Sequence, residues 1–329
     1  MNAAFWRDRR VLVTGATGIV GSWVVKELLA RRAFVAALIL DANPQSELFR
    51  NGDIAQIAVV NGRLEEMGDI ERAINLFEIE TVIHLGAQTI VPVAHRNPLA
   101  TFEANIRGTY HLLEACRRQS TLVKHVVIAS SDKAYGEHSL LPYTEEMSLN
   151  AKHPYDVSKA CVEHLAASFH HTYGLPVSIS RSANVYGGGD LNWSRIVPGT
   201  IRSLLRGERP VLRSDGTFLR DYLYVKDAAR SYICLAEATD DPRNHGQVFN
   251  FGPESPVSVL EIVSRIQKQL QREDLVPEIL NCATGEIRNQ YLSAEKARRE
   301  LGWKCEYDLD RGLSETINWY RDFLGERSA

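Results

Sequence analysis

Asp132 and Lys133 place an acid beside a base in the segment SSDKAYG, residues 130–136. The segment follows the apolar run HVVIA, which is typical of a buried β-strand. The end of a strand needs only a turn, and the tripeptide SDK is compatible with an ordinary surface turn. An acid and a base held at the end of a buried strand could instead move protons on a bound molecule. The segment therefore allows two interpretations, a surface turn and a catalytic pair.

Tyr155 and Lys159 form a second pair that could do chemistry. They lie in the segment YDVSKACVEHLAASFHHTYG, which has the pattern of a helix through about Tyr173. Their i, i+4 spacing places both side chains on one face of that helix. A nearby ammonium group stabilises a phenolate and lowers the pKa of the phenol, which is ordinarily about 10. The pair is suited to removing a proton from a hydroxyl group, although the same spacing is common on helix surfaces.

A glycine-rich loop, TGATGIVG, places Gly15, Gly18 and Gly21 directly after the apolar run RVLVT. The first glycine permits a tight turn, the second lets the backbone approach a pyrophosphate, and the third lets the following helix pack closely. Asp41 lies 20 residues after Gly21, where its carboxylate can accept hydrogen bonds from both ribose hydroxyls. A carboxylate would repel a 2′-phosphate, and no arginine follows it in DANPQ. The loop therefore predicts a site for NAD rather than NADP.

Strand-like and helix-like segments alternate through the first half of the chain. Alternation of this kind predicts an α/β fold with a Rossmann-type, doubly wound parallel sheet, which binds ligands beyond the carboxyl ends of its strands. We expect an NAD-binding domain over residues 1–187 and a smaller mixed α/β C-terminal substrate domain over residues 188–329, with some segments returning to the first domain. The expected strands are 10–15, 34–41, one within 54–62, 81–87 and 125–131.

The composition excludes several classes of protein. The 329 residues are 44% hydrophobic and 24% charged, which is typical of a soluble globular chain. A net charge of −3 predicts no general affinity for nucleic acid or an anionic membrane, and no apolar run approaches the ~18 residues of a membrane span. The five cysteines lack metal-ligand spacing, so we expect no metal and free thiols in the cytoplasm.

Nearly the whole chain resembles the extended short-chain dehydrogenase/reductase family, which includes nucleotide-sugar epimerases and dehydratases. The resemblance implies tightly held NAD, a nucleotide-sugar substrate, oxidation at C4 of a hexose as the first step, and a homodimer built on helices at about 98–118 and 155–173. The segments that carry it are TGATGIVG, HLGAQ, NIRGT, ASSDKAYG, YDVSK, RSANVYGGGD, RDYLYVKDAA, VFNFG and LGWKCEYDLDRGLSETINWY.

The resemblance also implies which residues contact the ligands. Arg220 and Arg288 match two arginines that contact the diphosphate, and a guanidinium fork suits phosphate oxygens. Each of them could instead be a solvated surface charge, and Arg209 or Arg213 could substitute. The implied substrate contacts are Gln88, Ser131, Asn184, Arg195, Ile196, Arg220 and Arg288. The implied cofactor contacts are Gly15, Gly18, Ile19, Val20, Gly21, Asp41, Arg63, Leu64, Leu85, Gly86, Ala87, Gln88, Asn105, Tyr155 and Lys159.

The stretch from Ser131 to Tyr135 bears on which reaction follows the oxidation. Typical hexose 4,6-dehydratases have Thr-Asp-Glu, one further residue and Tyr here, and the Asp-Lys version resembles that of CDP-glucose 4,6-dehydratases. The resemblance then implies that Tyr155 takes the O4 proton and that Ser131 hydrogen-bonds O4. It places Lys133 at the position of the C5 base. Lys133 could act as that base only if its pKa is lowered, and it would otherwise stabilise the enolate electrostatically. Asp132, if protonated, would be the acid for the C6 hydroxyl.

Other segments depart from the pattern of CDP-glucose 4,6-dehydratases. The loop ATGIVG replaces His-Thr-Gly-Phe-Lys-Gly, FLRDYLYVKDAA is more typical of epimerases, and GRL at 62–64 replaces an Asp beside the adenine. These differences leave the nucleotide base open. The favoured function is thus a nucleotide-hexose 4,6-dehydratase, a lyase. The alternatives are an NAD-dependent nucleotide-sugar 4-epimerase, for example of a UDP-sugar, and a non-catalytic NAD-binding protein, which would tend to have lost Tyr155 or Lys159.

Overall fold

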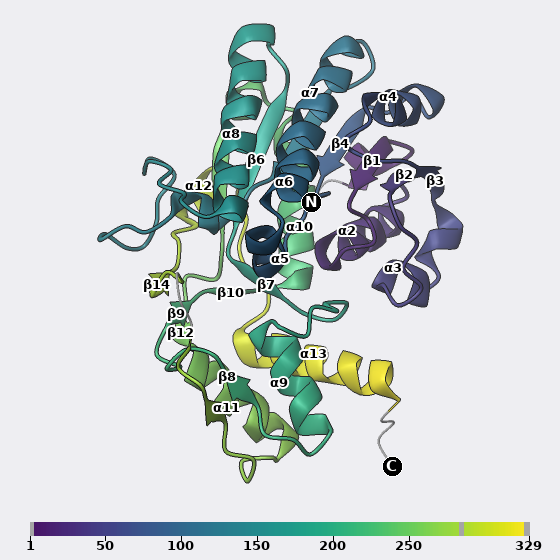
Figure 1. Ribbon diagram of the computed structural model, residues 1–329. Coiled ribbons are helices and arrows are strands. Elements are labelled where there is room, and N and C mark those ends of the chain that lie inside the picture. The colour runs from purple at the N-terminus through teal and green to yellow at the C-terminus, as the bar shows by residue number, and fades with distance from the viewer. Residues whose placement is uncertain (1–2, 283–285, 326–329) are drawn as a thin grey trace.

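A parallel β-sheet of seven strands forms the centre of the protein (Figure 1). The computed structural model describes residues 3–282 and 286–325. The strand order is β11-β6-β5-β4-β1-β2-β3, and every neighbouring pair is parallel, which confirms the predicted doubly wound sheet. The strands are β1 (Arg10–Thr14), β2 (Phe34–Ile39), β3 (Ala58–Asn61), β4 (Thr81–His84), β5 (His125–Ala129), β6 (Val177–Ser182) and β11 (Val248–Phe251).

Helices cover both faces of this sheet. Successive side chains of a strand point to opposite faces, so one strand contributes to two separate buried clusters. In β1, Val11 and Val13 belong to one buried cluster and Leu12 to the other. The first cluster includes side chains of α1 (Ala3–Trp6), α2 (Ile19–Ala30), α3 (Glu47–Arg50), α10 (Val225–Ala238) and α12 (Glu295–Leu301). The second includes side chains of α4 (Met67–Leu76), α7 (Gly108–Arg118) and α8 (Pro154–Tyr173).

A smaller region with a third buried cluster lies below the sheet in the view of Figure 1. Its helices are α9 (Ile196–Leu205), α11 (Val259–Leu270) and α13 (Leu309–Leu324). Its short strands are β7 (Asn184–Tyr186) paired with β10 (Tyr222–Tyr224), β8 (Val211–Leu212) with β13 (Glu278–Ile279), and β9 (Leu219–Arg220) between β12 (Val257–Ser258) and β14 (Asn289–Gln290). The predicted smaller, mixed α/β C-terminal region is thereby confirmed.

Parts of the chain after residue 188 belong to the large sheet. Strand β11 pairs with β6 at the sheet edge, and α10 packs against α2. Phe249 and Phe251 of β11 are fully buried in the first cluster. The two regions are therefore interleaved in sequence, and the domain boundary at residue 187 stays a prediction.

The remaining short helices lie in connections. They are α5 (Val91–Arg96), α6 (Pro98–Phe102), the π-helix η2 (Glu103–Arg107) and the 3₁₀ helices η1 (Asp53–Gln56), η3 (Asp132–Tyr135) and η4 (Pro242–Asn244). Among the described residues, no helix is both long and apolar enough to cross a membrane.

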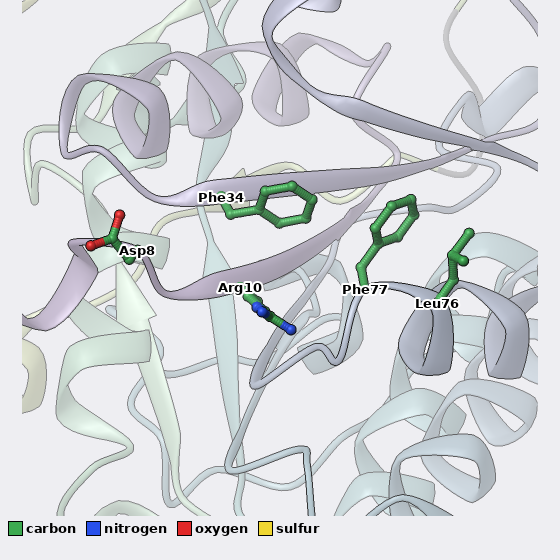
Figure 2. A pocket seen from close by; sticks show the side chains of 5 residues that line it. All are labelled: Asp8, Arg10, Phe34, Leu76 and Phe77. Atoms are coloured by element: carbon green, nitrogen blue, oxygen red, sulfur yellow. The ribbon is translucent and has the colours of Figure 1, made fainter.

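The residues at the carboxyl ends of the large sheet's strands differ in chemistry from those at the amino ends. Strands β1, β4 and β5 are neighbours, so the glycine loop and the segment SSDKAYG both lie beyond the carboxyl ends of the strands. A cavity of about 360 Å³ lies at the amino ends, where β1 and β2 begin (Figure 2). Its lining is Asp8, Arg10, Phe34, Leu76 and Phe77, and none of these is a predicted site residue. The chemistry is therefore to be sought at the carboxyl ends.

Candidate active site

The segment after β5 turns inward as the 3₁₀ helix η3. Ser131 caps this helix: its Oγ accepts a hydrogen bond from the Lys133 N–H at 3.2 Å and donates one to Asp132 Oδ1 at 3.1 Å. Asp132 is only 2% exposed, and Lys133 is partly buried. The interpretation of SDK as a surface turn is therefore wrong.

Lys133 reaches from the end of β5 to the smaller region. Its Nζ donates a hydrogen bond to Gln290 Oε1 at 2.5 Å. Gln290 lies on β14 and is fully buried, and its Nε2 has no hydrogen-bond partner in the described structure. Sequence reasoning did not identify Gln290, and no local pattern marks it, because the contact joins residues 157 positions apart.

Burial changes the protonation of Asp132 and Lys133 in opposite directions. It raises the pKa of the Asp132 carboxyl, and the charge of Lys133 opposes the shift. It lowers the pKa of the Lys133 ammonium, and the charge of Asp132 opposes that shift. Both shifts favour a protonated Asp132 beside a neutral Lys133. That protonation state supplies a proton donor and a proton acceptor at one place.

Tyr155 and Lys159 lie in the first turns of α8, which packs against η3. They are 8% and 5% exposed, and Lys159 Nζ donates to the carbonyl oxygen of Ala129 at 2.7 Å. Burial lowers the pKa of Lys159 to about 8. Burial also raises the pKa of Tyr155, opposed by a hydrogen bond with Ser131 and the charge of Arg195. The sequence-based expectation of a lowered phenol pKa is therefore wrong here, because desolvation of the phenolate outweighs the favourable charges.

The glycine loop fits the pyrophosphate of a dinucleotide. Gly15 has φ +72°, and a Cβ there would lie 2.7 Å from the Gly86 nitrogen. A Cβ at Gly21 would lie 2.1 Å from the Gly15 oxygen, so α2 packs directly on the loop. Gly18 caps α2 without any side-chain hydrogen bond, which leaves the first N–H groups of the helix for a phosphate. Asp41 is exposed just after β2, which is the strand next to β1. These residues would hold NAD.

A buried histidine, His84, links the ends of β1 and β4 to α7 beside this site. His84 Nδ1 lies 2.7 Å from Thr14 Oγ1, and its Nε2 lies 3.1 Å from Thr109 Oγ1. Thr109 Oγ1 donates to the Asn105 carbonyl oxygen at 2.5 Å, so it must accept the hydrogen of His84 Nε2. Burial lowers the pKa of His84 to about 3, which keeps this ring neutral. Sequence reasoning missed His84, although it ends β4 directly before the predicted contact Leu85.

Asn105 connects the loop after β4 to the helix of Tyr155. Its Oδ1 accepts from the Gln88 N–H at 2.7 Å, and its Nδ2 donates to Ser158 Oγ at 2.9 Å. Ser158 in turn donates to the Tyr155 carbonyl oxygen at 2.7 Å. Asn105 occupies the π-helix η2, an irregularity that often marks functional sites. The structure thus brings together two predicted cofactor residues, Gln88 and Asn105, and the helix that carries Tyr155.

The other predicted cofactor residues line the same carboxyl-end edge. Gly86 and Leu64 are adjacent, since a Cβ on Gly86 would lie 2.8 Å from Leu64 Cδ1. Arg63 is exposed, and its N–H donates to Asp69 Oδ2. The remaining ones are partly buried in the loop after β4 or in the first turn of α2: Ile19, Val20, Leu85 and Ala87.

The two predicted diphosphate-binding arginines differ in exposure and in the hydrogen bonds that they already make. Arg220 is 9% exposed and donates to the carbonyl oxygens of Leu219, Ile287 and Arg288. Arg288 is exposed directly before β14, and its Nη2 lies 3.4 Å from Thr217 Oγ1. Arg220 must therefore give up backbone contacts to meet a phosphate, whereas Arg288 is available.

Three further predicted substrate residues lie around β7 and the start of α9. Asn184 Nδ2 is buried without a hydrogen-bond partner in the described structure. Arg195 pairs with the buried Asp190 at 3.0 Å, and Ile196 begins α9. Of the alternative arginines, Arg213 is exposed, as Arg288 is, and the Nε of the exposed Arg209 donates to the Val276 carbonyl oxygen.

Comparison with known proteins places this geometry in a family. The model of the "NAD dependent epimerase/dehydratase family" matches residues 11–252. The chain is 28% identical to the CDP-glucose 4,6-dehydratase of Salmonella typhimurium, over 97% of this chain and 92% of that protein.

Solved structures give the same result. The UDP-glucose 4-epimerase of Thermotoga maritima with UDP-glucose has a TM-score of 0.88 and 28% identity, covering 96% of this chain and 99% of that one. The dTDP-glucose 4,6-dehydratase of Bacillus anthracis, in complex with NAD, has a TM-score of 0.85 and 25% identity, covering 95% and 97%. The chain is therefore an NAD-dependent enzyme that belongs to the NAD dependent epimerase/dehydratase family.

Proposed function

We propose that the protein is a nucleotide-hexose 4,6-dehydratase whose substrate resembles CDP-glucose and whose product is a 4-keto-6-deoxy sugar nucleotide. The observation that carries this proposal is the buried pair Asp132–Lys133 at the end of β5. Burial favours the protonated acid and the neutral amine, which an elimination of water needs. An epimerase, which only returns hydrogen to C4, has no use for such a pair.

Tyr155 and Ser131 act at the first carbon. NAD, when bound, serves as the acceptor of the C4 hydride and as its donor to C6. Tyr155 takes the proton of O4 in its phenolate form, which burial disfavours and which the hydrogen bond with Ser131 and the charge of Arg195 favour. Ser131 also orients O4. Lys159 holds its charge one helical turn from Tyr155, beside the Ala129 carbonyl oxygen.

Asp132 and Lys133 carry out the elimination. The new ketone at C4 makes the C5 proton acidic, and neutral Lys133 takes that proton. Asp132 gives its own proton to O6, so the C6–O6 bond breaks, water leaves, and a C5–C6 double bond forms. The proton on Lys133 returns to C5 once the double bond is reduced. Because C4 stays a ketone, Tyr155 releases the O4 proton to solvent, and Asp132 regains a proton from solvent. All three residues then end in their starting protonation states, and the net change is the loss of one water.

The substrate would lie between the two regions of the chain. Arg288 and Arg220 would bind the diphosphate, Asn184 would donate its unpartnered amide to it, and Arg195 with Ile196 would line the base. Gln88 would contact the sugar from the loop after β4. We also propose that residues 1–187 bind NAD and residues 188–329 bind the nucleotide-sugar.

We further propose that the enzyme is a cytoplasmic homodimer. The helices at 98–118 and 155–173 leave Leu99, Tyr110 and Tyr173 at 69%, 38% and 57% exposure, and a second copy of the chain would cover them. Light scattering that gives the mass of one chain would contradict the dimer.

A 4-epimerase is the second candidate, because the Thermotoga maritima 4-epimerase has nearly the same backbone. One incubation separates the two. The protein is mixed with NAD and, in turn, CDP-, dTDP-, UDP- and GDP-glucose, and the products are weighed by mass spectrometry. A dehydratase gives a product lighter by one water, whereas an epimerase gives a product of unchanged mass. Binding of NAD without turnover of any sugar nucleotide would favour a non-catalytic protein.

A further inference from the structure

Gln290 is a buried side chain that the proposed steps leave without a role. It lies on β14 in the smaller region, and its Nε2 has no hydrogen-bond partner in the described structure. Gln267, a buried glutamine of the same region, instead donates its Nε2 to the Leu275 carbonyl oxygen at 3.0 Å. An apolar side chain of the same length would leave no unpaired atom at position 290, and an unpaired buried donor is energetically unfavourable. Packing alone therefore does not explain the glutamine.

The backbone around Gln290 is fixed on two sides. Within the smaller region, β14 pairs with β9, where Gln290 stands opposite Arg220. On the side of the large sheet, the Tyr143 N–H donates to the Tyr291 carbonyl oxygen at 3.0 Å, and the Ser293 N–H donates to the Tyr143 carbonyl oxygen at 2.8 Å. Tyr143 is fully buried and belongs to the first buried cluster. The side chain of Gln290 therefore extends from a backbone that both regions hold in place.

Gln290 presents its carbonyl oxygen to Lys133. The contact from Lys133 Nζ to Gln290 Oε1, at 2.5 Å, is the one hydrogen bond of that amine among the described residues. A neutral amine has two N–H groups and one lone pair, so an amine that donates to Oε1 keeps its lone pair for a proton. The opposite orientation of the amide would direct an Nε2 hydrogen at that lone pair. The contact thus fixes the amine and leaves free the electron pair that a base needs.

We propose that Gln290 is a positioning residue, which holds Lys133 Nζ in place for removal of the C5 proton. This inference rests on the proposed dehydratase function, in which Lys133 takes that proton. Gln290 itself exchanges no proton and none of its covalent bonds changes. Arg288, a proposed diphosphate contact, lies two residues before it, so one segment of the smaller region would hold both the substrate and the base.

The two chemical steps then depend on Gln290 unequally. Oxidation at C4 uses Tyr155 and Ser131, neither of which hydrogen-bonds Gln290 in the described structure. The loss of water needs Lys133 at the correct place, and a displacement of a reacting group by about 1 Å can slow a step about 10²-fold. A glutamine that served only to stabilise the fold would affect both steps alike.

The experiment follows the two steps separately in wild-type enzyme and in Gln290→Met, whose side chain is unbranched and lacks the carbonyl oxygen. Enzyme with bound NAD is mixed with the glucose nucleotide that the wild type turns over, with CDP-glucose tried first, at a pH above the acid limb, where Lys133 is neutral. Absorbance reports reduction of NAD, and mass spectrometry of quenched samples reports loss of water. We expect NAD reduction within about twofold of wild type and loss of water about 10²-fold slower, so that the reduced cofactor accumulates.

Two more variants guard this experiment against effects on folding. Gln290→Glu keeps an acceptor oxygen for Lys133, so above its own acid limb it should restore most of the wild-type rate of water loss. Gln247→Met removes a similar contact outside the site, where Lys296 Nζ donates to Gln247 Oε1 at 3.0 Å, and should leave both rates unchanged.

Three outcomes would overturn the role of Gln290. They are unchanged loss of water in Gln290→Met, an equal fall in both steps, and no recovery with Gln290→Glu. Each of them leaves the dehydratase supported as long as the wild-type product is lighter by one water. A wild-type product of unchanged mass, or no product, would instead refute the dehydratase and with it the step that Gln290 serves.

Discussion

Two acid–base pairs lie close together near the end of β5, and they are built differently. The first pair joins Glu163 of α8 to Arg181 of β6, with side chains only 4% and 5% exposed. Arg181 Nη2 lies 2.6 Å from Glu163 Oε2 and Nε lies 2.9 Å from Oε1, and Ser130 donates to the same carboxylate. In the second pair, Asp132 Oδ2 has no partner in the described structure, and Lys133 contacts a neutral amide.

The difference separates a structural pair from a reactive one. Fork-shaped contacts give both carboxylate oxygens of Glu163 a partner on Arg181, and the charge of Glu163 opposes the lowering of the Lys159 pKa by burial. Asp132 and Lys133 have too few hydrogen bonds to repay their desolvation, so each is shifted toward its neutral form. Buried groups with strongly altered proton affinity cluster at functional sites. A bound substrate would supply the contacts that this second pair lacks.

Asp132→Asn should have the largest effect on activity and little effect on stability. Asparagine has nearly the same shape but cannot give a proton to O6. We expect kcat for the dehydrated product to fall about 10²–10⁴-fold. The free energy of unfolding should change by less than about 1 kcal/mol, because the lost carboxyl group was incompletely hydrogen-bonded. Turnover is measured by mass spectrometry of the product and stability by urea unfolding; full turnover to the same product would remove Asp132 from the mechanism.

Glu163→Gln should do the opposite and act first on stability. The substitution leaves the Arg181 guanidinium buried without its counter-charge. We expect a loss of about 3–5 kcal/mol in the free energy of unfolding, measured by urea titration. Glu261→Gln is the matched control, because it breaks an exposed pair with Arg265 at 2.8 Å and should cost less than about 0.5 kcal/mol. Equal losses in the two variants would mean that burial does not distinguish these pairs.

Gln290→Glu should change the pH dependence of the reaction. The new carboxylate would lie within hydrogen-bond distance of Lys133 Nζ and would raise the Lys133 pKa. Lys133 must be neutral to accept the C5 proton, so activity is lost as pH falls through its pKa. The acid limb of the kcat profile should therefore move to higher pH. At a fixed pH below the limb, kcat should fall about tenfold for each unit by which the Lys133 pKa rises.

Gln290→Met is the control for this shift, since it removes the amide without adding charge. We expect its acid limb to stay at or below the wild-type position, because the amine then loses an acceptor that favours the ammonium form. If Gln290→Glu leaves the limb in place, the group that titrates in the profile is not Lys133.

Local sequence was sufficient to predict the elements that carry the two pairs. The β1–loop–α2 unit is encoded by Gly15, Gly18 and Gly21 within a few residues, and the structure shows why a side chain would not fit at Gly15 or Gly21. The helix of Tyr155 and Lys159 begins at a proline and runs to Tyr173, as its pattern predicts. Both cases depend on contacts between residues near in sequence, which a single chain displays.

Long-range contacts and burial could not be predicted in the same way. Gln290 meets Lys133 only because β14 pairs with β9 in the smaller region. The neutral state of His84 depends on two threonines from β1 and α7. The sequence shows that Tyr155 has a lysine four residues away, but it does not show that the phenol is 8% exposed, and that burial decides the direction of its pKa.

Arg10→Ala should have the smallest effect and sets the lower end of the comparison. Arg10 pairs with Glu78 at the edge of the sheet opposite the site, beside the cavity of Figure 2, and their side chains are 44% and 64% exposed. Water already solvates both charges, so the pair gains little and removing it leaves no buried ion. We expect a change of about 0.5 kcal/mol or less in the free energy of unfolding, measured by urea titration, and unchanged kcat and KM. A loss as large as that of Glu163→Gln would show that burial of charge does not decide how much an ion pair stabilises this protein.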